Sequence, residues 1–305
     1  MLRTSYDPET MPIRLLRIGM LALLVAAARA QAPAWQSAAG GTMAFEVASI
    51  RVTEPGKFSP PSFALSSDDS MRPTGGEFHA DFPLIVYIEF AYKIWPSRDQ
   101  TAAMLAQMPK WATTEHFTIH AKAAGNPSKD QYRLMVQALL AERFKLAVHF
   151  ENREVAALAM TLEKPGKLGP NLRPHSEGPA CDPAAAMFGS AVFPGQCGSY
   201  SARPSKNGMW LNGSRDTTME LLANFVAMSA DQGRPVVDRT GLTGRYDFTL
   251  EFVADTHGPA AATATDAEGP TFLEALHDQL GLKLAPIRAT VQVLAIDHVE
   301  QPTEN

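Results

Sequence analysis

The segment Arg245-Tyr-Asp-Phe-Thr-Leu-Glu-Phe252 decides the fold, because apolar and polar side chains alternate along its whole length. A period of two residues is typical of a β-strand that buries one face and exposes the other. An earlier segment, Glu115-His-Phe-Thr-Ile-His-Ala-Lys122, alternates in the same way. The chain therefore contains two similar half-buried strands, and the predicted elements around them follow one order in both halves.

A helix is predicted before each of these strands, over Pro83 to Lys93 and over Asp216 to Met228. Each strand is followed by a second amphipathic helix and then by two more strands. These last strands are Phe144–Leu146 and Val155–Glu163 in the first half, and Leu282–Leu284 and Thr290–Val299 in the second. We expect an internal repeat with the order strand, helix, strand, helix, strand, strand.

Capping signals support three of the four helices. A Ser or Thr followed three residues later by Gln or Glu is a capping box, which satisfies the free backbone N–H groups at a helix start. The chain has this spacing at Ser128/Gln131, Thr217/Glu220 and Thr271/Glu274. Gly281 follows the last helix, where a glycine can adopt the left-handed conformation that ends it.

These elements predict an α+β fold made of two related small βα modules. Each module is expected to be a mainly antiparallel sheet with two helices on one face. A strand pair, Phe45–Val52 and Ser70–Ala80, precedes the first helix, with Gly75-Gly76 placed to turn a hairpin. We expect the first module over residues 44–163, a connector rich in Pro and Gly over 164–207, and the second module over 208–300.

The chain starts with a segment typical of a secretory signal peptide. Arg14 and Arg17 precede the apolar stretch Ile18–Ala28, and Ala28-Arg-Ala30 has the form of a cleavage site. The apolar stretch is too short to span a bilayer. We expect residues 1–30 to be removed and the protein to be periplasmic or extracellular; an uncleaved anchor is the alternative, and translation could start at Met1 or Met11.

Composition excludes two classes of partner. The formal net charge is −5 and the sequence has no basic cluster, which disfavours binding to a nucleic-acid backbone. After signal cleavage we expect no membrane span, because the best remaining candidate, Leu84 to Trp95, is short and carries two charged residues.

Two cysteines, Cys181 and Cys197, lie in the predicted connector. In an exported protein such a pair is expected to form a disulfide, and two free thiols are the alternative. No C-x-x-C motif is present, so a redox-active dithiol is not predicted.

The densest polar segment is Asp238-Arg-Thr-Gly-Leu-Thr-Gly-Arg-Tyr-Asp247. It could be a ligand loop with contacts from Asp238, Arg239, Arg245 and Asp247. The alternative is a turn before the strand that is held by pairing between its Asp and Arg residues.

Known catalytic signatures are absent from the sequence, and we expect no cofactor, no metal and no catalytic residue. His116 and His120 share one face of a strand, but about 13 Å of strand separates them, too far for two ligands of one ion. Trp95 and Trp111 lie in one irregular stretch, where they could bind a sugar or peptide or else anchor a loop.

The chain resembles a large family of exported bacterial proteins of unknown function, first described as soil-associated. The matching motifs are Phe45-Glu-Val-Ala-Ser-Ile50, Ala91-Tyr92, Pro109 with Trp111, Leu139-Leu-Ala-Glu-Arg-Phe-Lys-Leu146, the run from Gly233 to Phe248, and Leu280-Gly-Leu-Lys-Leu284. Gln100–Met108 departs from the family pattern, which has a glycine there. Some family members carry a similar domain after a membrane metallopeptidase of the beta-lactam-sensor type, which implies extracytoplasmic sensing.

Each half also resembles the short N-terminal domain of secretins and TonB-dependent receptors, a module that docks peptides or neighbouring modules. Together the resemblances imply a non-catalytic binding, interaction or sensing module of the cell envelope. An extended peptide or an envelope protein could add to an open sheet edge. The alternatives are an extracytoplasmic hydrolase with a site near Asp238–Asp247, and a structural envelope component.

Overall fold

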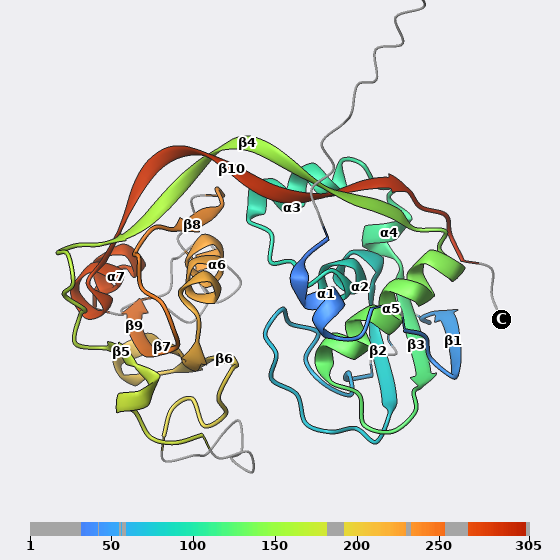
Figure 1. The fold of residues 1–305 in the computed structure, drawn as a ribbon, viewed down its shortest axis with the longest axis horizontal. Helices are drawn as coiled ribbons and strands as arrows, with labels where there is room; N and C mark the ends of the chain where they lie inside the picture. The colour runs from blue at the N-terminus through green and yellow to red at the C-terminus, as the bar shows by residue number, and fades with distance from the viewer. Residues whose placement is uncertain are drawn as a thin grey trace, which may run out of the picture.

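The computed structural model describes residues 32–41, 43–54, 56, 59–181, 192–229, 233–253 and 268–302. The predicted signal peptide lies outside these residues. Helices combine with mostly antiparallel sheets, which confirms the α+β class. Figure 1 shows two lobes side by side, with a long two-stranded ribbon running over both of them.

The first lobe is built on a three-stranded antiparallel sheet with the order β1-β3-β2. Its strands are β1 (Val47–Val52), β2 (Glu77–Pro83) and β3 (His116–Lys122). The helices are α1 (Ala34–Ala38), α2 (Leu84–Ala91), α3 (Arg98–Leu105), α4 (Trp111–Thr114) and α5 (Lys129–Arg143). Alternate residues of β3, among them Phe117 and Ile119, are fully buried and pack in one core with α2 and α5.

The second lobe is built on a four-stranded antiparallel sheet with the order β5-β9-β7-β6. Its elements are β5 (Leu172–Pro174), η1 (His175–Glu177), β6 (Tyr200–Pro204), η2 (Lys206–Gly208), β7 (Met209–Thr217), α6 (Met219–Ser229), β9 (Tyr246–Val253) and α7 (Phe272–Leu280). Phe248 and Leu250 of β9 are buried against α6 and α7. The predicted connector therefore supplies two strands to this sheet.

The ribbon consists of β4 (Ala147–Leu162) and β10 (Leu282–His298), paired antiparallel over nearly their whole length. A short strand, β8 (Val236–Asp238), adds to β4 in parallel. β4 begins in the first core with Phe150 and ends in the second with Leu158 and Met160, and β10 runs the opposite way. One continuous ladder thus ties the two lobes together.

The structure confirms the local signals at most helix ends. Ser128 and Gln131 form a reciprocal capping box on α5, and Thr271 and Glu274 form one on α7. Gly281 has a φ of 68° and ends α7 in the left-handed conformation. The third cap was predicted one residue too early, because the Leu221 N–H donates to the Thr218 hydroxyl at 3.2 Å and α6 begins at Met219.

Two predictions about strands are wrong. The segments Phe45–Val52 and Ser70–Ala80 do not form a hairpin, because β1 and β2 each pair with β3 and lie on its opposite sides. Gly75-Gly76 instead leads into β2, where a side chain at Gly76 would meet the Ala123 carbonyl oxygen at 2.2 Å.

In the second half, the two strands predicted separately, Leu282–Leu284 and Thr290–Val299, belong to one strand, β10. In the first half, Phe144–Leu146 forms no strand and joins α5 to β4, which contains most of the predicted strand Val155–Glu163. The central part of the ribbon spans the gap between the cores, so the apolar pattern weakens there although the ladder continues.

In both lobes a strand, a helix, a strand, a helix and a ribbon strand follow in this order: β2, α2, β3, α5, β4, and β7, α6, β9, α7, β10. The first lobe has in addition α3 and α4 between α2 and β3, where a loop was expected. Ser97 and Gln100 form a capping box that starts α3. That the lobes are two copies of one module stays a prediction. No helix in the described part of the chain has the length and apolar character needed to cross a membrane.

Candidate functional site

The four residues predicted as ligand contacts do not form one site. Asp238 ends β8 and its Oδ1 accepts hydrogen bonds from the Thr240 N–H at 2.9 Å and the Thr240 hydroxyl at 2.8 Å. The exposed Arg239 donates its backbone N–H to the Met160 carbonyl at 2.8 Å. Both interactions hold the turn after β8, which favours the structural interpretation at this end of the segment.

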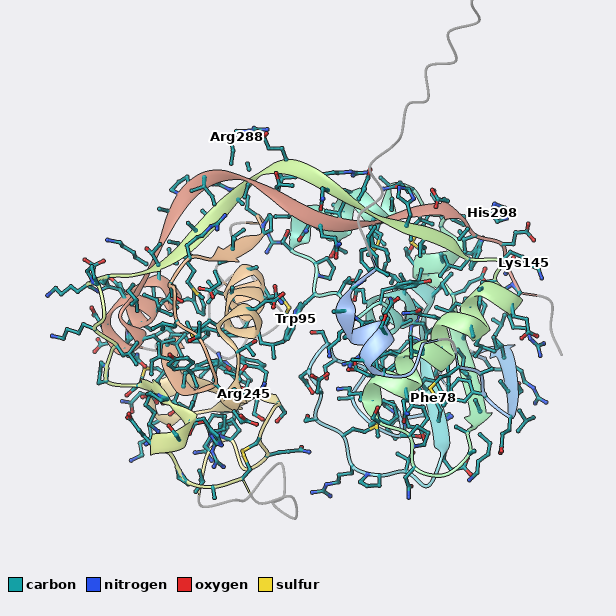
Figure 2. The ribbon with its side chains drawn as sticks, viewed as in Figure 1. Phe78, Trp95, Lys145, Arg245, Arg288 and His298 are labelled. Atoms are coloured by element: carbon teal, nitrogen blue, oxygen red, sulfur yellow. A yellow bond between two sulfur atoms is a disulfide. The ribbon has the colours of Figure 1, made fainter. Side chains whose placement is uncertain are left out.

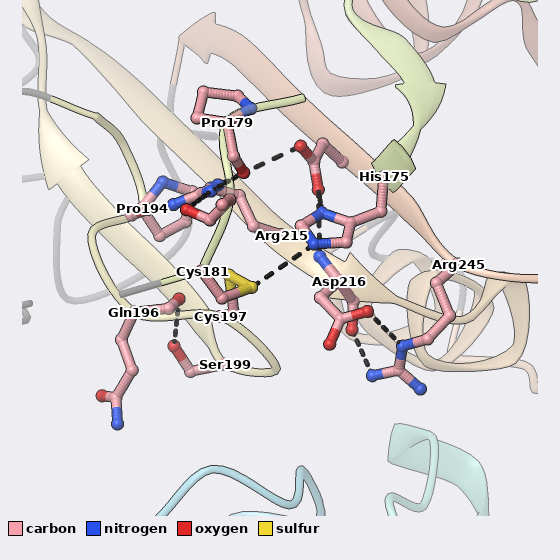
Figure 3. Close-up of a disulfide and its surroundings, with 12 residues drawn as sticks. His175, Pro179, Cys181, Pro194, Gln196, Cys197, Ser199, Arg215, Asp216 and Arg245 are labelled. Atoms are coloured by element: carbon pink, nitrogen blue, oxygen red, sulfur yellow. Dashed lines mark hydrogen bonds and ion pairs between the residues drawn. A yellow bond between two sulfur atoms is a disulfide. The ribbon is translucent and has the colours of Figure 1, made fainter. Parts of the chain in front are cut away.

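The other end of the segment leads to a different cluster. The Arg245 Nε lies 2.5 Å from Asp216 Oδ1, so this arginine pairs with β7 rather than with Asp238. Asp247 is on β9 and points the other way, into a buried polar cluster beside the disulfide. We call this cluster the disulfide centre; it comprises His175, Cys181, Cys197, Arg215 and Asp247 (Figure 3).

In the disulfide centre, Cys181 and Cys197 are bonded at 2.06 Å, which confirms the predicted pair. His175 Nδ1 lies 2.6 Å from Asp247 Oδ1, and its other nitrogen, Nε2, lies 3.4 Å from the Cys181 sulfur. The Asp216 N–H also donates to Asp247 Oδ1, at 3.0 Å. The carboxylate therefore fixes the imidazole ring, and the ring faces the disulfide.

Arg215 provides a buried positive charge in this centre. It is 3% exposed and Asp247 is 4% exposed, with 4.0 Å between Arg215 Nε and Asp247 Oδ2. The guanidinium also donates to the carbonyls of Pro179, Ala180 and Pro194. Arg215 thus holds the backbone just before Cys181 and the backbone shortly before Cys197.

A cleft of about 870 Å³ lies between the two lobes under the ribbon. Its walls come from α3, α6 and β8, and the ribbon closes it from above. Figure 2 shows Trp95 between the lobes and Arg288 on the outer side of the ribbon. The Trp95 indole contacts Met228 of α6, so this side chain joins the two lobes at the cleft.

The ribbon presents an apolar face to the cleft. The register pairs Arg153 with Val291 and Val155 with Ala289, and side chains on one face of a strand recur every second residue. Val155, Val291 and Val293 line the cleft and are half-buried.

The cleft has unpaired carboxylates but no unpaired cation among its described lining residues. Lys93 Nζ is 2.5 Å from Asp69 and 3.1 Å from Asp130. Arg153 pairs with Glu151 and Arg288 pairs with Glu154, so the three cations of the lining are already neutralised. Asp99 on α3 and Glu220 on α6 form no side-chain hydrogen bond or ion pair with another described residue. Together with Asp238, these carboxylates leave the cleft with excess negative charge.

The lining lacks the side chains that usually start covalent catalysis. Among the described residues around the cleft there is no Cys, His, Ser or Tyr. The polar groups are carboxylates, amides, Thr290 and the paired cations Lys93, Arg153 and Arg288. Groups of this kind form hydrogen bonds and ion pairs with a ligand.

His116 and His120 of the first sheet have different partners. His120 lies beside His79, with 3.2 Å between their Nδ1 atoms, whereas His116 Nδ1 is 3.4 Å from Asp81 Oδ1. Burial and the neighbouring His120 lower the pKa of His79. Within the described residues, the group with metal-ligand spacing is His175, Cys181 and Cys197, and the disulfide removes both thiolates from it.

Reasoning from the sequence missed His175 and Arg215. They lie far from Asp247 along the chain, and the spacing of six residues between His175 and Cys181 was the available signal.

Comparison with known proteins gives one match. The family model described as "Protein of unknown function (DUF3738)" matches residues 86–299, well over half of the chain. No curated protein and no solved structure matches.

Proposed function

Because the chain belongs to the DUF3738 family of proteins of unknown function, we propose from its geometry that it is an exported, non-catalytic binding protein. Its ligand occupies the cleft between the lobes. The observation that carries this proposal is the cleft itself, whose volume of about 870 Å³ lies in the range of ligand sites. Valine side chains of the ribbon line one side of the cleft, and polar side chains of α3 and α6 line the others, an arrangement suited to binding.

The proposed ligand is an extended peptide. All three residues of β8 line the cleft. The Pro235 carbonyl accepts from Leu158 and the Arg239 N–H donates to Met160, so the odd-numbered residues bond to β4. The backbone groups of Val236 and Asp238 therefore point to the opposite side, where no described strand pairs with β8. A short peptide strand can add there by main-chain hydrogen bonds.

The charge of the cleft favours a peptide that carries Lys or Arg. Asp99, Glu220 and Asp238 come from three different elements and converge on one cavity. The cations beside them are already paired, so a basic ligand gains attraction without first breaking an internal ion pair.

Export and sensing complete the proposal. The Cys181–Cys197 disulfide fits an oxidising compartment outside the cytoplasm, in line with the signal-like N-terminus. The resemblance to the soil-associated exported family, with its metallopeptidase-linked members, supports a sensing role. The likeness of each half to the secretin and TonB short domain supports peptide docking and two copies of one module, over residues 44–163 and 208–300.

The alternative of a hydrolase needs the residues of the segment Asp238–Asp247 to form one site, and the structure separates the two ends of this segment. Asp238 lines the cleft, whereas Asp247 is buried in the disulfide centre. A structural envelope component would self-associate, and the experiment below separates it from a monomeric binder.

The test measures binding of short extended peptides to the mature protein, residues 31–305, by calorimetry and by intrinsic tryptophan fluorescence, to which Trp95 in the cleft contributes. We expect saturable binding of peptides with two or three Lys or Arg residues, and weaker binding of acidic peptides of equal length. The pair D99N/E220Q should weaken binding about two- to thirtyfold, since each exposed ion pair contributes about 0.2–1 kcal/mol.

The matched control is E46Q, which removes one exposed carboxylate outside the cleft and should leave affinity unchanged. Equal binding of acidic and basic peptides, or no saturable binding, refutes the proposed ligand. Peptide cleavage detected by mass spectrometry refutes the non-catalytic role, and light scattering that rises steeply with concentration favours the structural component.

A further inference from the structure

The disulfide centre contains a chain of three interacting groups that peptide binding does not use. Asp247 accepts from His175 at 2.6 Å, and His175 Nε2 faces the Cys181 sulfur at 3.4 Å. With Nδ1 held by the carboxylate, Nε2 is directed at the sulfur in any protonation state. This is the arrangement by which a base and its orienting acid activate a cysteine.

Arg215 lies next to Cys181, because its guanidinium donates to the carbonyls of Pro179 and Ala180, the two residues before it. Arg215 is buried beside the centre, and Arg173 Nη2 lies 3.7 Å from Asp247 Oδ2. Two guanidinium groups and a protonatable imidazole thus face a single carboxylate. Cationic neighbours stabilise a thiolate, and a stabilised thiolate is a good leaving group in thiol–disulfide exchange.

The two sulfurs differ in this respect. His175 Nε2 lies 3.4 Å from the Cys181 sulfur, whereas the Cys197 sulfur lies within 4.8 Å of the same ring and has no hydrogen bond to a described histidine. Both are accessible, Cys181 being exposed and Cys197 half-buried. A thiolate that attacks the Cys197 sulfur therefore displaces Cys181, which is the better stabilised leaving group.

From this asymmetry we infer that the Cys181–Cys197 disulfide is redox-active and accepts two electrons from an external dithiol. One thiol of the dithiol gives its proton to His175 and attacks the Cys197 sulfur, and the S–S electron pair moves to Cys181, which leaves as a thiolate beside the imidazolium ring. The second thiol of the dithiol then breaks the mixed disulfide and releases Cys197 as a thiol. The dithiol becomes a disulfide, and its two protons end on His175 and Cys197.

Arg215 favours the reverse reaction, in which the two thiols form the disulfide again. Its guanidinium holds the carbonyls of Pro179 and Ala180, just before Cys181, and of Pro194, shortly before Cys197. These contacts do not depend on the S–S bond, so they keep the two thiols near each other after reduction. Oxidation then reforms the same pair, as a reversible switch needs.

The experiment equilibrates the full mature chain in dithiothreitol buffers of graded redox ratio, alkylates the free thiols and counts them by mass spectrometry. H175Q should need a reducing ratio at least about tenfold higher for half reduction, equivalent to about 30 mV for a two-electron couple. The matched control is H277Q, since His277 is an exposed histidine of the same lobe with Nδ1 2.6 Å from Asp278 Oδ1. It should behave as the unchanged protein does.

A second measurement needs no variant. In the reduced protein, Cys181 should react with iodoacetamide at lower pH than Cys197, because thiolate is the reactive form. Equal pH profiles for the two cysteines, or equal half-reduction ratios for H175Q and the unchanged protein, overturn the inference. Neither result depends on the cleft, so it leaves the peptide proposal unaffected.

Discussion

Arg133 provides the sharpest test of how the first lobe is held together. It lies on α5 with its side chain 0% exposed, a burial that a charged group tolerates when ion pairs and hydrogen bonds compensate it. Its Nη1 is 2.9 Å from Asp69 Oδ1 and also contacts Asp130. Its Nη2 donates to the carbonyls of Ser66 at 3.0 Å and Asp68 at 2.5 Å.

We predict that R133M destabilises the protein by about 3–5 kcal/mol, the usual cost of removing one partner from a buried charged network. Methionine fills most of the space, so the effect reports the lost charge and hydrogen bonds. It also leaves two carbonyls of the 66–69 segment without their donor, and each buried unsatisfied group costs about 1–3 kcal/mol.

The assay is urea unfolding followed by circular dichroism and by tryptophan fluorescence, and coincident transitions justify a two-state fit. The matched control is R288M, because Arg288 makes a 2.5 Å ion pair with Glu154 while its side chain is 68% exposed. That pair should contribute less than about 1 kcal/mol. A loss below about 1 kcal/mol for R133M, or equal losses for the two variants, refutes the reasoning.

Two further predictions concern pH and backbone conformation. Burial raises the pKa of Glu89 to about 7 from an ordinary 4.5, so its stabilising effect is complete below pH 4.5 and is lost as pH rises through 7. E89Q should therefore flatten the dependence of stability on pH between 4.5 and 7, as measured by thermal unfolding, and an unchanged slope would contradict this assignment. Gly281 has a φ of 68°, and an added Cβ would lie 2.7 Å from the Gly169 nitrogen. G281A should therefore lower the free energy of unfolding in urea by at least about 1–2 kcal/mol. Gly241 has a φ of 71° but open space around it, so G241A should lose only the free energy of holding alanine in the left-handed conformation.

The elements that depend on neighbouring residues could be predicted well. Phe117 and Phe248 are buried on alternating strands, and the Ser128 and Thr271 caps start their helices where the spacing indicates. These features follow from side-chain periodicity and from hydrogen bonds between residues three apart. Both interactions are local, so the sequence carries them directly.

The elements that depend on partners distant along the chain could not be predicted from the sequence. β1 and β2 pair with β3 across a long stretch of chain, and a glycine pair beside them resembles a hairpin signal. The middle of the ribbon lacks a core beneath it, so its apolar pattern is interrupted although β4 and β10 remain paired. Pairing of this kind is decided by which strands meet after collapse.

By itself, the sequence determined the fold class, the positions of most helices and strands and the cysteine pair, because each rests on short-range pattern. Tertiary structure alone decided the sites. Tertiary packing separates Asp238 from Asp247. It places Asp238 in the cleft under the ribbon and brings His175 and Arg215 next to Asp247. The physical reason is that binding and redox chemistry need groups a few ångströms apart in space, and only the packing of the two lobes sets those distances.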